Sequence, residues 1–156
     1  MRMGGSMNSS RDQHGGSDSG LPVAVARLAR ALNAHDLDAL AACFSEDYVN
    51  ETPAHPLRGF TGRQQVRANW EQIFAGVPDI RCAVLGVAVN GDQAWIEWSM
   101  TGSRRDGSAH ELAGVTVFTV PADEITAARF FLEPVERGSG TVSDAVRRQV
   151  SDASAP

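Results

Sequence analysis

The chain has 156 residues, of which 42% are hydrophobic and 21% charged, and its formal net charge is −5. This length suits one domain, and the composition is that of an ordinary soluble globular protein. An acidic balance gives no electrostatic reason to expect a nucleic-acid partner, and no apolar run approaches the roughly 18 residues of a membrane span. We therefore expect a single domain that binds neither nucleic acid nor membrane.

Both ends of the chain are rich in glycine and serine. Residues 1–20 contain no continuous apolar stretch of the kind that a secretion signal needs, so we expect a disordered tail there. Residues 138–156 predict a second flexible tail, which can hold one short helix capped by Ser143. Cys43 and Cys82 lie among apolar neighbours and predict buried free thiols. These features together predict a cytoplasmic protein.

The segment between the tails, residues 21–137, begins with helical periodicity. Apolar residues recur at helical spacing from Leu21 to Ala34, which predicts a first helix. Asp36 is placed to cap a second, shorter helix whose apolar face extends to Phe44. Two short helices with adjacent apolar faces predict an antiparallel pair that packs against a sheet.

A third helix is predicted after a short strand, residues 48–52, and a proline-rich loop. The run Thr61-Gly62-Arg63-Gln64 has the spacing of a capping box, in which the Thr hydroxyl and the Gln amide bond the first free N–H groups of a helix. Gly76 and Pro78 are expected to end this helix.

The rest of the domain predicts a meander of four strands. The pair Asn90-Gly91 is a strong hairpin signal, and Asp106-Gly107 marks a second turn. The four predicted strands span residues 80–89, 93–103, 109–120 and 125–133. Helices at the start and antiparallel strands at the end make an α+β architecture, and a sheet this long must curl, here over the third helix.

Three stretches of residues 21–137 together resemble SnoaL-like domains of the nuclear transport factor 2-like superfamily, whose other members include limonene-epoxide hydrolases and ketosteroid isomerases. The stretches are ALNAHDLDALAACFSEDYVNETP, GRQQVRANWEQIFAGVPDIRCAVLGVAVNGDQAWIEW and GVTVFTVPADEITAARFFLEPVE. The resemblance implies a cone-shaped, curved antiparallel sheet packed on three N-terminal helices. It also implies a pocket inside the cone and, often, a dimer interface on the convex sheet face.

The resemblance further implies which side chains face the pocket. The candidate catalytic residues are Tyr48, Asn50 and His110. The imidazole of His110, with an ordinary pKa of about 6.5, can transfer protons, while the phenol of Tyr48 and the amide of Asn50 can orient a carbonyl. The expected pocket wall comprises Thr52, Trp70, Trp98, Met100, Thr116, Phe118, Phe130 and Leu132. The aromatic members of this set could equally form the core.

The ionisable groups of the family's enzymes are missing from the matching positions. Leu or Thr occupies the positions at which ketosteroid isomerases carry their ionisable catalytic residues. Phe130 occupies the position at which limonene-epoxide hydrolases and SnoaL cyclases carry an acidic residue. Glu97 and Glu133 are expected on the convex face, in salt bridges. A bulge that reversed their strands would turn both carboxylates into the pocket and make them catalytic candidates.

Two functions remain open at this point. One is an acid/base enzyme of the cyclase, isomerase or epoxide-opening type acting on a hydrophobic small molecule, and the other is a non-catalytic ligand-binding or dimerisation module. An apolar set on the outer face predicts a homodimer: Val87, Val89, Trp95 and Phe131. The chain has neither a glycine-rich phosphate loop nor metal-ligand spacing of His and Cys, so we expect no cofactor and no metal.

Overall fold

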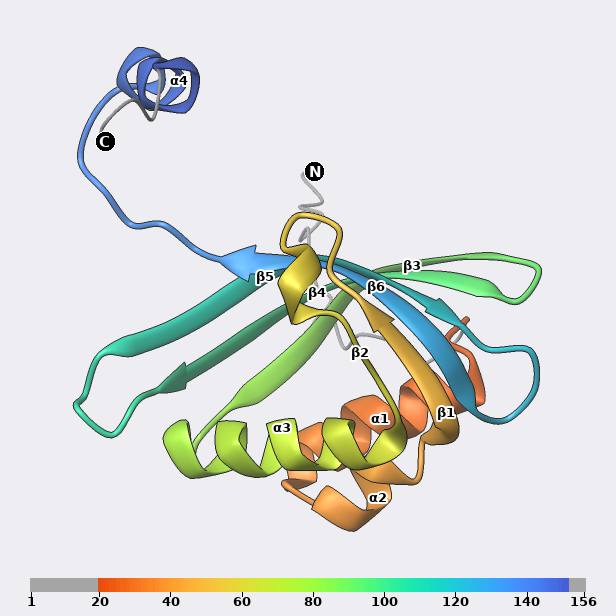
Figure 1. Cartoon of the computed structure of the whole chain (residues 1–156). Helices are drawn as coiled ribbons and strands as arrows, with labels where there is room; N and C mark the ends of the chain where they lie inside the picture. Colours follow the sequence, from red (N-terminus) through yellow and green to blue (C-terminus); the bar gives the residue numbers. More distant parts are fainter. Residues whose placement is uncertain (1–19, 152–156) are drawn as a thin grey trace, which may run out of the picture.

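A curved six-stranded sheet covers three helices in the computed structural model, which describes residues 20–151 (Figure 1). The helices are α1 (Val23–Ala34), α2 (Leu37–Ala41), α3 (Arg63–Gly76) and α4 (Val142–Val150), with one 3-10 helix, η1 (Pro56–Arg58). The strands are β1 (Phe44–Glu51), β2 (Phe60–Thr61), β3 (Arg81–Asn90), β4 (Gln93–Ser103), β5 (Ala109–Thr119) and β6 (Ile125–Pro134). The predicted α+β fold with a curved sheet over three N-terminal helices is confirmed.

The strand order is β2-β1-β6-β5-β4-β3. One pairing departs from the all-antiparallel sheet that the sequence predicted, because β1 and β6 run parallel. The chain leaves β1, crosses the open side of the sheet through α3 and returns through the meander, so β6 reaches β1 from the same direction. This closure shapes the cone, since it brings the first and last strands side by side (Figure 1).

The first two helices follow the sequence prediction with one change at their end. α1 buries one side, and the Asp36 carboxylate accepts a hydrogen bond from the backbone N–H of Ala39 at 3.0 Å, which confirms the predicted cap of α2. Phe44 was expected on the apolar face of that second helix, but it begins β1. His35 ends α1 with a left-handed backbone and bonds the carbonyl of Ile80 at 2.8 Å, which ties the helix pair to the loop before β3.

The predicted capping box at the start of α3 is wrong. The helix begins one residue later than a Thr61 cap would require, and its N-cap is Gly62, with φ of 102° and no side-chain cap. Thr61 instead belongs to β2 and pairs with Val49 of β1, and the N–H of Gly62 donates to the carbonyl of Tyr48 at 2.7 Å. Pairing with β1 thus takes the backbone out of the geometry that the box needs.

The C-terminal helix is capped by a different residue than predicted. Thr141, rather than Ser143, is the N-cap of α4, and its reciprocal bonds with Asp144 form a capping box. Figure 1 shows α4 standing apart from the rest of the described structure, and its valines Val142, Val146 and Val150 are exposed. The tail predicted at residues 1–20 lies outside the described residues except for Gly20. No helix within residues 20–151 is long and apolar enough to cross a membrane.

Alternation along the strands decides which side chains face the helices. In β4, Ala94, Ile96, Trp98 and Met100 are all buried, as predicted, while Glu97 between them is exposed. The sheet is irregular in two places, in β3 between Val84 and Gly86 and in the pairing of β1 with β6 between Phe44 and Val49, but the registers of β4 against β5 and of β5 against β6 are unbroken. The bulge in β3 pairs Val87 and Val89 with the inward-facing Ile96 and Ala94, so the prediction that these two valines lie on the outer face is wrong. Glu133 pairs with Ala113 on the outer face of β6. Both carboxylates therefore stay on the convex face.

The two cysteines are free, with Cys43 buried and Cys82 half-buried. Burial raises the pKa of both thiols, that of Cys82 to about 11 although a hydrogen bond from Asn33 opposes the rise. Because the thiolate is the nucleophilic form, neither cysteine is activated at neutral pH. Their role is packing.

Candidate functional site

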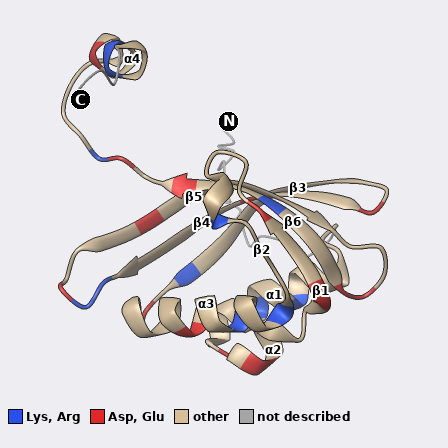
Figure 2. Ribbon diagram, viewed as in Figure 1, with Lys and Arg blue, Asp and Glu red and all other residues tan. Residues whose placement is uncertain are grey.

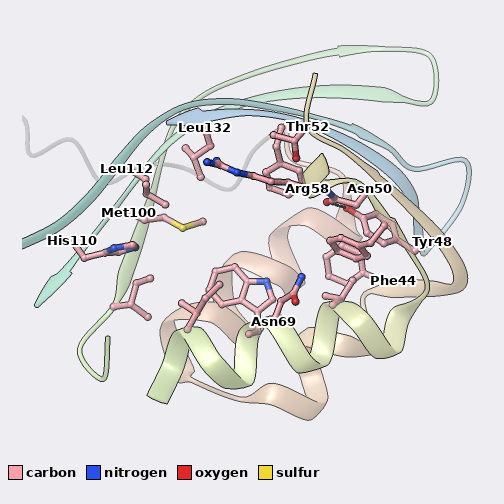
Figure 3. A pocket seen from close by; sticks show the side chains of 16 residues that line it. Phe44, Tyr48, Asn50, Thr52, Arg58, Asn69, Met100, His110, Leu112 and Leu132 are labelled. Carbon is pink, nitrogen blue, oxygen red and sulfur yellow. Dashed lines mark hydrogen bonds between the residues drawn. The ribbon is translucent and has the colours of Figure 1, made fainter. Parts of the chain in front are cut away.

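A cavity of about 240 Å³ lies between the concave face of the sheet and α3 (Figure 3). Its apolar lining consists of Phe44, Phe60, Val66, Trp70, Ile73, Ile80, Met100, Leu112, Phe130 and Leu132. Its polar lining consists of Tyr48, Asn50, Thr52, Arg58, Asn69 and His110. Small-molecule pockets typically measure about 300–1,000 Å³, so this one suits a ligand of one or two rings, or part of a longer one.

The structure brings most of the predicted site residues together. Eight of them line the cavity: Tyr48, Asn50, Thr52, Trp70, Met100, His110, Phe130 and Leu132. They come from the first strand and the residue that follows it, from the third helix and from the last three strands, which meet only in the folded chain.

Three residues predicted for the pocket wall lie in the core instead. Trp98, Thr116 and Phe118 are each at most 1% exposed and do not line the cavity. The Trp98 indole donates to the Thr116 hydroxyl at 3.1 Å and meets the edge of the Phe118 ring at 5.7 Å between centroids. They face the concave side as expected, but buried residues of α1 such as Val25 and Leu28 belong to the same apolar cluster and fill this part of the cone.

Tyr48 and Asn50 lie on one face of β1 because side chains two residues apart in a strand point the same way. The Tyr48 hydroxyl donates to Asn50 Oδ1 at 3.0 Å (Figure 3). Burial raises the pKa of Tyr48, so the phenol stays protonated and acts as the donor in this bond. With Oδ1 engaged, the amide Nδ2 of Asn50 is the group left for a ligand.

His110 lies at the other side of the cavity, near the start of β5 (Figure 3). Its Nδ1 accepts a hydrogen bond from Arg104 at 3.2 Å, which assigns the ring proton of the neutral imidazole to Nε2. Partial burial, and then the positive charge of Arg104, lower the pKa of His110 below its ordinary value. At neutral pH the ring is therefore uncharged, and its free nitrogen is an N–H donor.

Two polar lining residues escaped sequence reasoning. Asn69 interrupts the apolar face that Val66 and Ile73 share on α3, and a polar residue at that spacing was the available signal. Arg58 comes from η1, which the sequence predicts only as a loop. The prolines predict a turn in this segment, but they do not indicate on which side of the sheet the segment lies.

The site is rich in donors and poor in ionised acids. No Asp or Glu occurs among the described residues that line the cavity. The acidic residues, red in Figure 2, are dispersed over helices, strands and turns. The strand registers place Glu97 and Glu133 on the outer face. Residues 20–151 hold no group of three or more His, Cys, Asp or Glu side chains that could bind a metal. The site can hold and polarise an acceptor oxygen, but it lacks a carboxylate that could take a proton.

A curved sheet closed over three helices around an apolar pocket defines the nuclear transport factor 2-like class of α+β proteins. Within that class the chain belongs to the SnoaL-like domain family, whose sequence pattern matches residues 25–128. Among curated proteins, none is similar enough in sequence to count as a relative.

Solved structures share the fold at low sequence identity. A candidate SnoaL-like polyketide cyclase from Jannaschia sp. CCS1 is 22% identical, with a TM-score of 0.61, over 70% of this chain and 83% of that one. IdmH, a candidate polyketide cyclase from Streptomyces antibioticus, is 19% identical, with a TM-score of 0.62, over 70% of this chain and 89% of that one. A hypothetical protein of ketosteroid isomerase-like fold from Catenulispora acidiphila, solved with trimethylamine, is 22% identical, with a TM-score of 0.59, over 69% of this chain and 83% of that one.

Proposed function

We propose that the protein binds a hydrophobic small molecule whose carbonyl or similar acceptor oxygen bonds the Asn50 amide inside the cone. The observation that carries this proposal is the Tyr48–Asn50 hydrogen bond at the wall of a mainly apolar cavity. A buried amide fixed by a neighbouring phenol is an oriented donor, and a few oriented polar groups in an apolar cavity are the usual design of a ligand site. The polyketide class named for two structural neighbours supplies molecules of this chemistry.

A second candidate function is catalysis on the same ligand, as in a cyclase or an isomerase. The neutral His110 favours it, because an uncharged imidazole N–H can polarise a carbonyl as an electrophile. In that case the His110 N–H would stabilise negative charge that develops on an oxygen at its side of the cavity while Asn50 holds the ligand from the other side, and the proton would leave to water or to a group of the substrate. Exchange of His110 for alanine would then slow turnover, while simple binding would tolerate it.

Two neutral naphthalene probes test the binding proposal. We expect 2-acetonaphthone, which carries a carbonyl, to bind more tightly than 2-ethylnaphthalene, which has the same shape without an acceptor. In Asn50→Leu the affinity for the ketone should fall about five- to tenfold, the value of one hydrogen bond, while the affinity for the hydrocarbon stays unchanged or rises. Isothermal titration calorimetry measures both. Equal losses for the two probes would contradict a role for the amide.

We also propose a homodimer through the convex sheet face. Phe131 on β6 is 42% exposed there, Trp95 on β4 is half-buried, and Leu85 at the bulge of β3 is 61% exposed. A monomer seldom exposes several large apolar side chains on one sheet face, so a second copy of the same face is the simplest cover. The free thiols of Cys43 and Cys82 support the cytoplasm as the compartment, since free cysteines persist in a reducing environment.

Phe131→Glu should convert the proposed dimer into a monomer. A carboxylate at the centre of an apolar interface would have to be buried without a partner in both copies, which costs more than the contact yields. Size-exclusion chromatography with light scattering at micromolar concentration measures the mass. A wild-type protein that runs as a monomer would overturn the proposal, whatever the variant does.

A further inference from the structure

Arg58 is the only cation among the described residues that line the cavity. It ends η1, the short helix that follows β1, and Figure 3 shows its side chain extending across the cavity toward Leu132. Arg58 is itself exposed although it lines the cavity, so its guanidinium lies at the opening, between solvent and the ligand space.

The segment that carries Arg58 is held in place by several bonds. The N–H groups of His55, Arg58 and Gly59 donate to the carbonyls of Thr52, His55 and Pro56 at 2.8, 2.9 and 3.1 Å. The His55 ring contacts the Glu133 carboxylate at 3.0 Å, which fastens the loop to the outer face of β6. Gly59 packs so closely on β1 that an added Cβ would lie 3.2 Å from the carbonyl oxygen of Asn50. The backbone position of Arg58 at the cavity is therefore set by the fold.

The guanidinium of Arg58 is uncommitted. Within residues 20–151 it forms no ion pair, whereas Arg63 pairs with Glu124 and Arg137 with Glu111. The cavity offers it no acid, since no described lining residue is Asp or Glu. A planar cation with its donors free, placed over an apolar cavity, has the geometry that binds an oxyanion such as a carboxylate.

We propose that the natural ligand is an amphipathic anion, with an apolar body inside the cavity and a carboxylate-type oxyanion bound by Arg58 at its opening. The proposal rests on the proposed function and adds the charge of the ligand to it. Asn50 and Arg58 then divide the recognition, with the amide bonding a neutral acceptor within the cavity and the guanidinium bonding the charged end.

Two probes with one aromatic body separate this inference from the proposed function. 2-Naphthoate carries a carboxylate where 2-acetonaphthone carries a neutral carbonyl, and calorimetry at neutral pH measures both affinities. We expect wild type to bind 2-naphthoate more tightly than the ketone. Arg58→Gln should weaken 2-naphthoate about tenfold or more, as expected for a hydrogen bond to a charged group, and should leave the ketone within about twofold.

Matched variants control for charge and for geometry. Arg129 is exposed on the outer face of β6, so Arg129→Gln removes the same charge far from the cavity and should leave both affinities unchanged. Arg58→Lys should keep part of the preference for 2-naphthoate, because it retains the charge but loses the planar pair of donors.

The possible failures are distinct. If both probes bind and Arg58→Gln weakens them equally or not at all, the anion site is wrong and the neutral pocket stands. An equal loss of 2-naphthoate affinity in Arg129→Gln would also overturn it, by assigning the effect to net charge. If neither probe binds wild type, the proposed function fails and this inference fails with it.

Discussion

Replacing Gly114 with alanine is expected to lower the free energy of unfolding by about 3 kcal/mol or more. Gly114 lies in the middle of β5 with φ of 148°, a backbone conformation that other residues rarely adopt. An added Cβ would overlap the carbonyl oxygen of Phe131 and lie 3.0 Å from the Cα of Leu132, so the clash is with backbone atoms of β6. At Gly114 the backbones of β5 and β6 thus approach each other more closely than a Cβ allows.

Urea unfolding followed by far-UV circular dichroism measures this loss, and two other glycines serve as controls. Gly107→Ala shares the positive φ, here 83°, but meets nothing within 4 Å, so it should lose only the conformational part. Gly76→Ala lies at the end of α3 in open space with no strained backbone and should be nearly neutral. A Gly114→Ala protein as stable as Gly107→Ala would mean that β6 moves to accept the Cβ, and the close approach of the two strands would not depend on glycine.

Trp98→Ala is expected to destabilise the protein by about 3–5 kcal/mol, the usual cost of removing a buried aromatic side chain. Trp98 is 1% exposed, packs edge-on against Phe118 and donates its indole N–H to Thr116. The substitution therefore leaves a cavity and also a buried hydroxyl that loses its donor. Thermal and urea unfolding measure the loss.

Trp70 provides the comparison that separates core from pocket. It is half-buried on α3 and lines the cavity, so Trp70→Ala should cost less than half as much stability while it weakens binding of 2-acetonaphthone. Equal losses of stability in the two variants would contradict the division between a packed core around Trp98 and a ligand space bounded by Trp70.

The fold was predictable because its signals are periodic. Alternation put Trp98 and Met100 on one face and Glu97 on the other, since each side chain in a strand faces opposite to its neighbours, and resemblance to the family indicated which face is the inner one. The Asp36 cap and the Asn90-Gly91 turn, where Gly91 has φ of 58°, are local and do not depend on the rest of the chain. Resemblance to the family then supplied how the elements are assembled.

The predictions that failed concern contacts between residues that are far apart in the sequence. Alternation gives the face of Trp98, Thr116 and Phe118 but not how far along the cone each lies, so residues of the core were assigned to the pocket wall. The Thr61 box was a sound local prediction that pairing of β2 with β1 overrode. Arg58 was missed because a loop that folds back has no periodicity from which its direction can be read.

A crystal structure of the protein soaked with 2-acetonaphthone tests the central claim most directly. We predict the naphthalene rings between Trp70 and Phe130, with the ketone oxygen within hydrogen-bond distance of the Asn50 Nδ2 and the Tyr48–Asn50 bond intact. A saturating soak that leaves the cavity without the ketone, or that places its oxygen away from Asn50, would contradict the account.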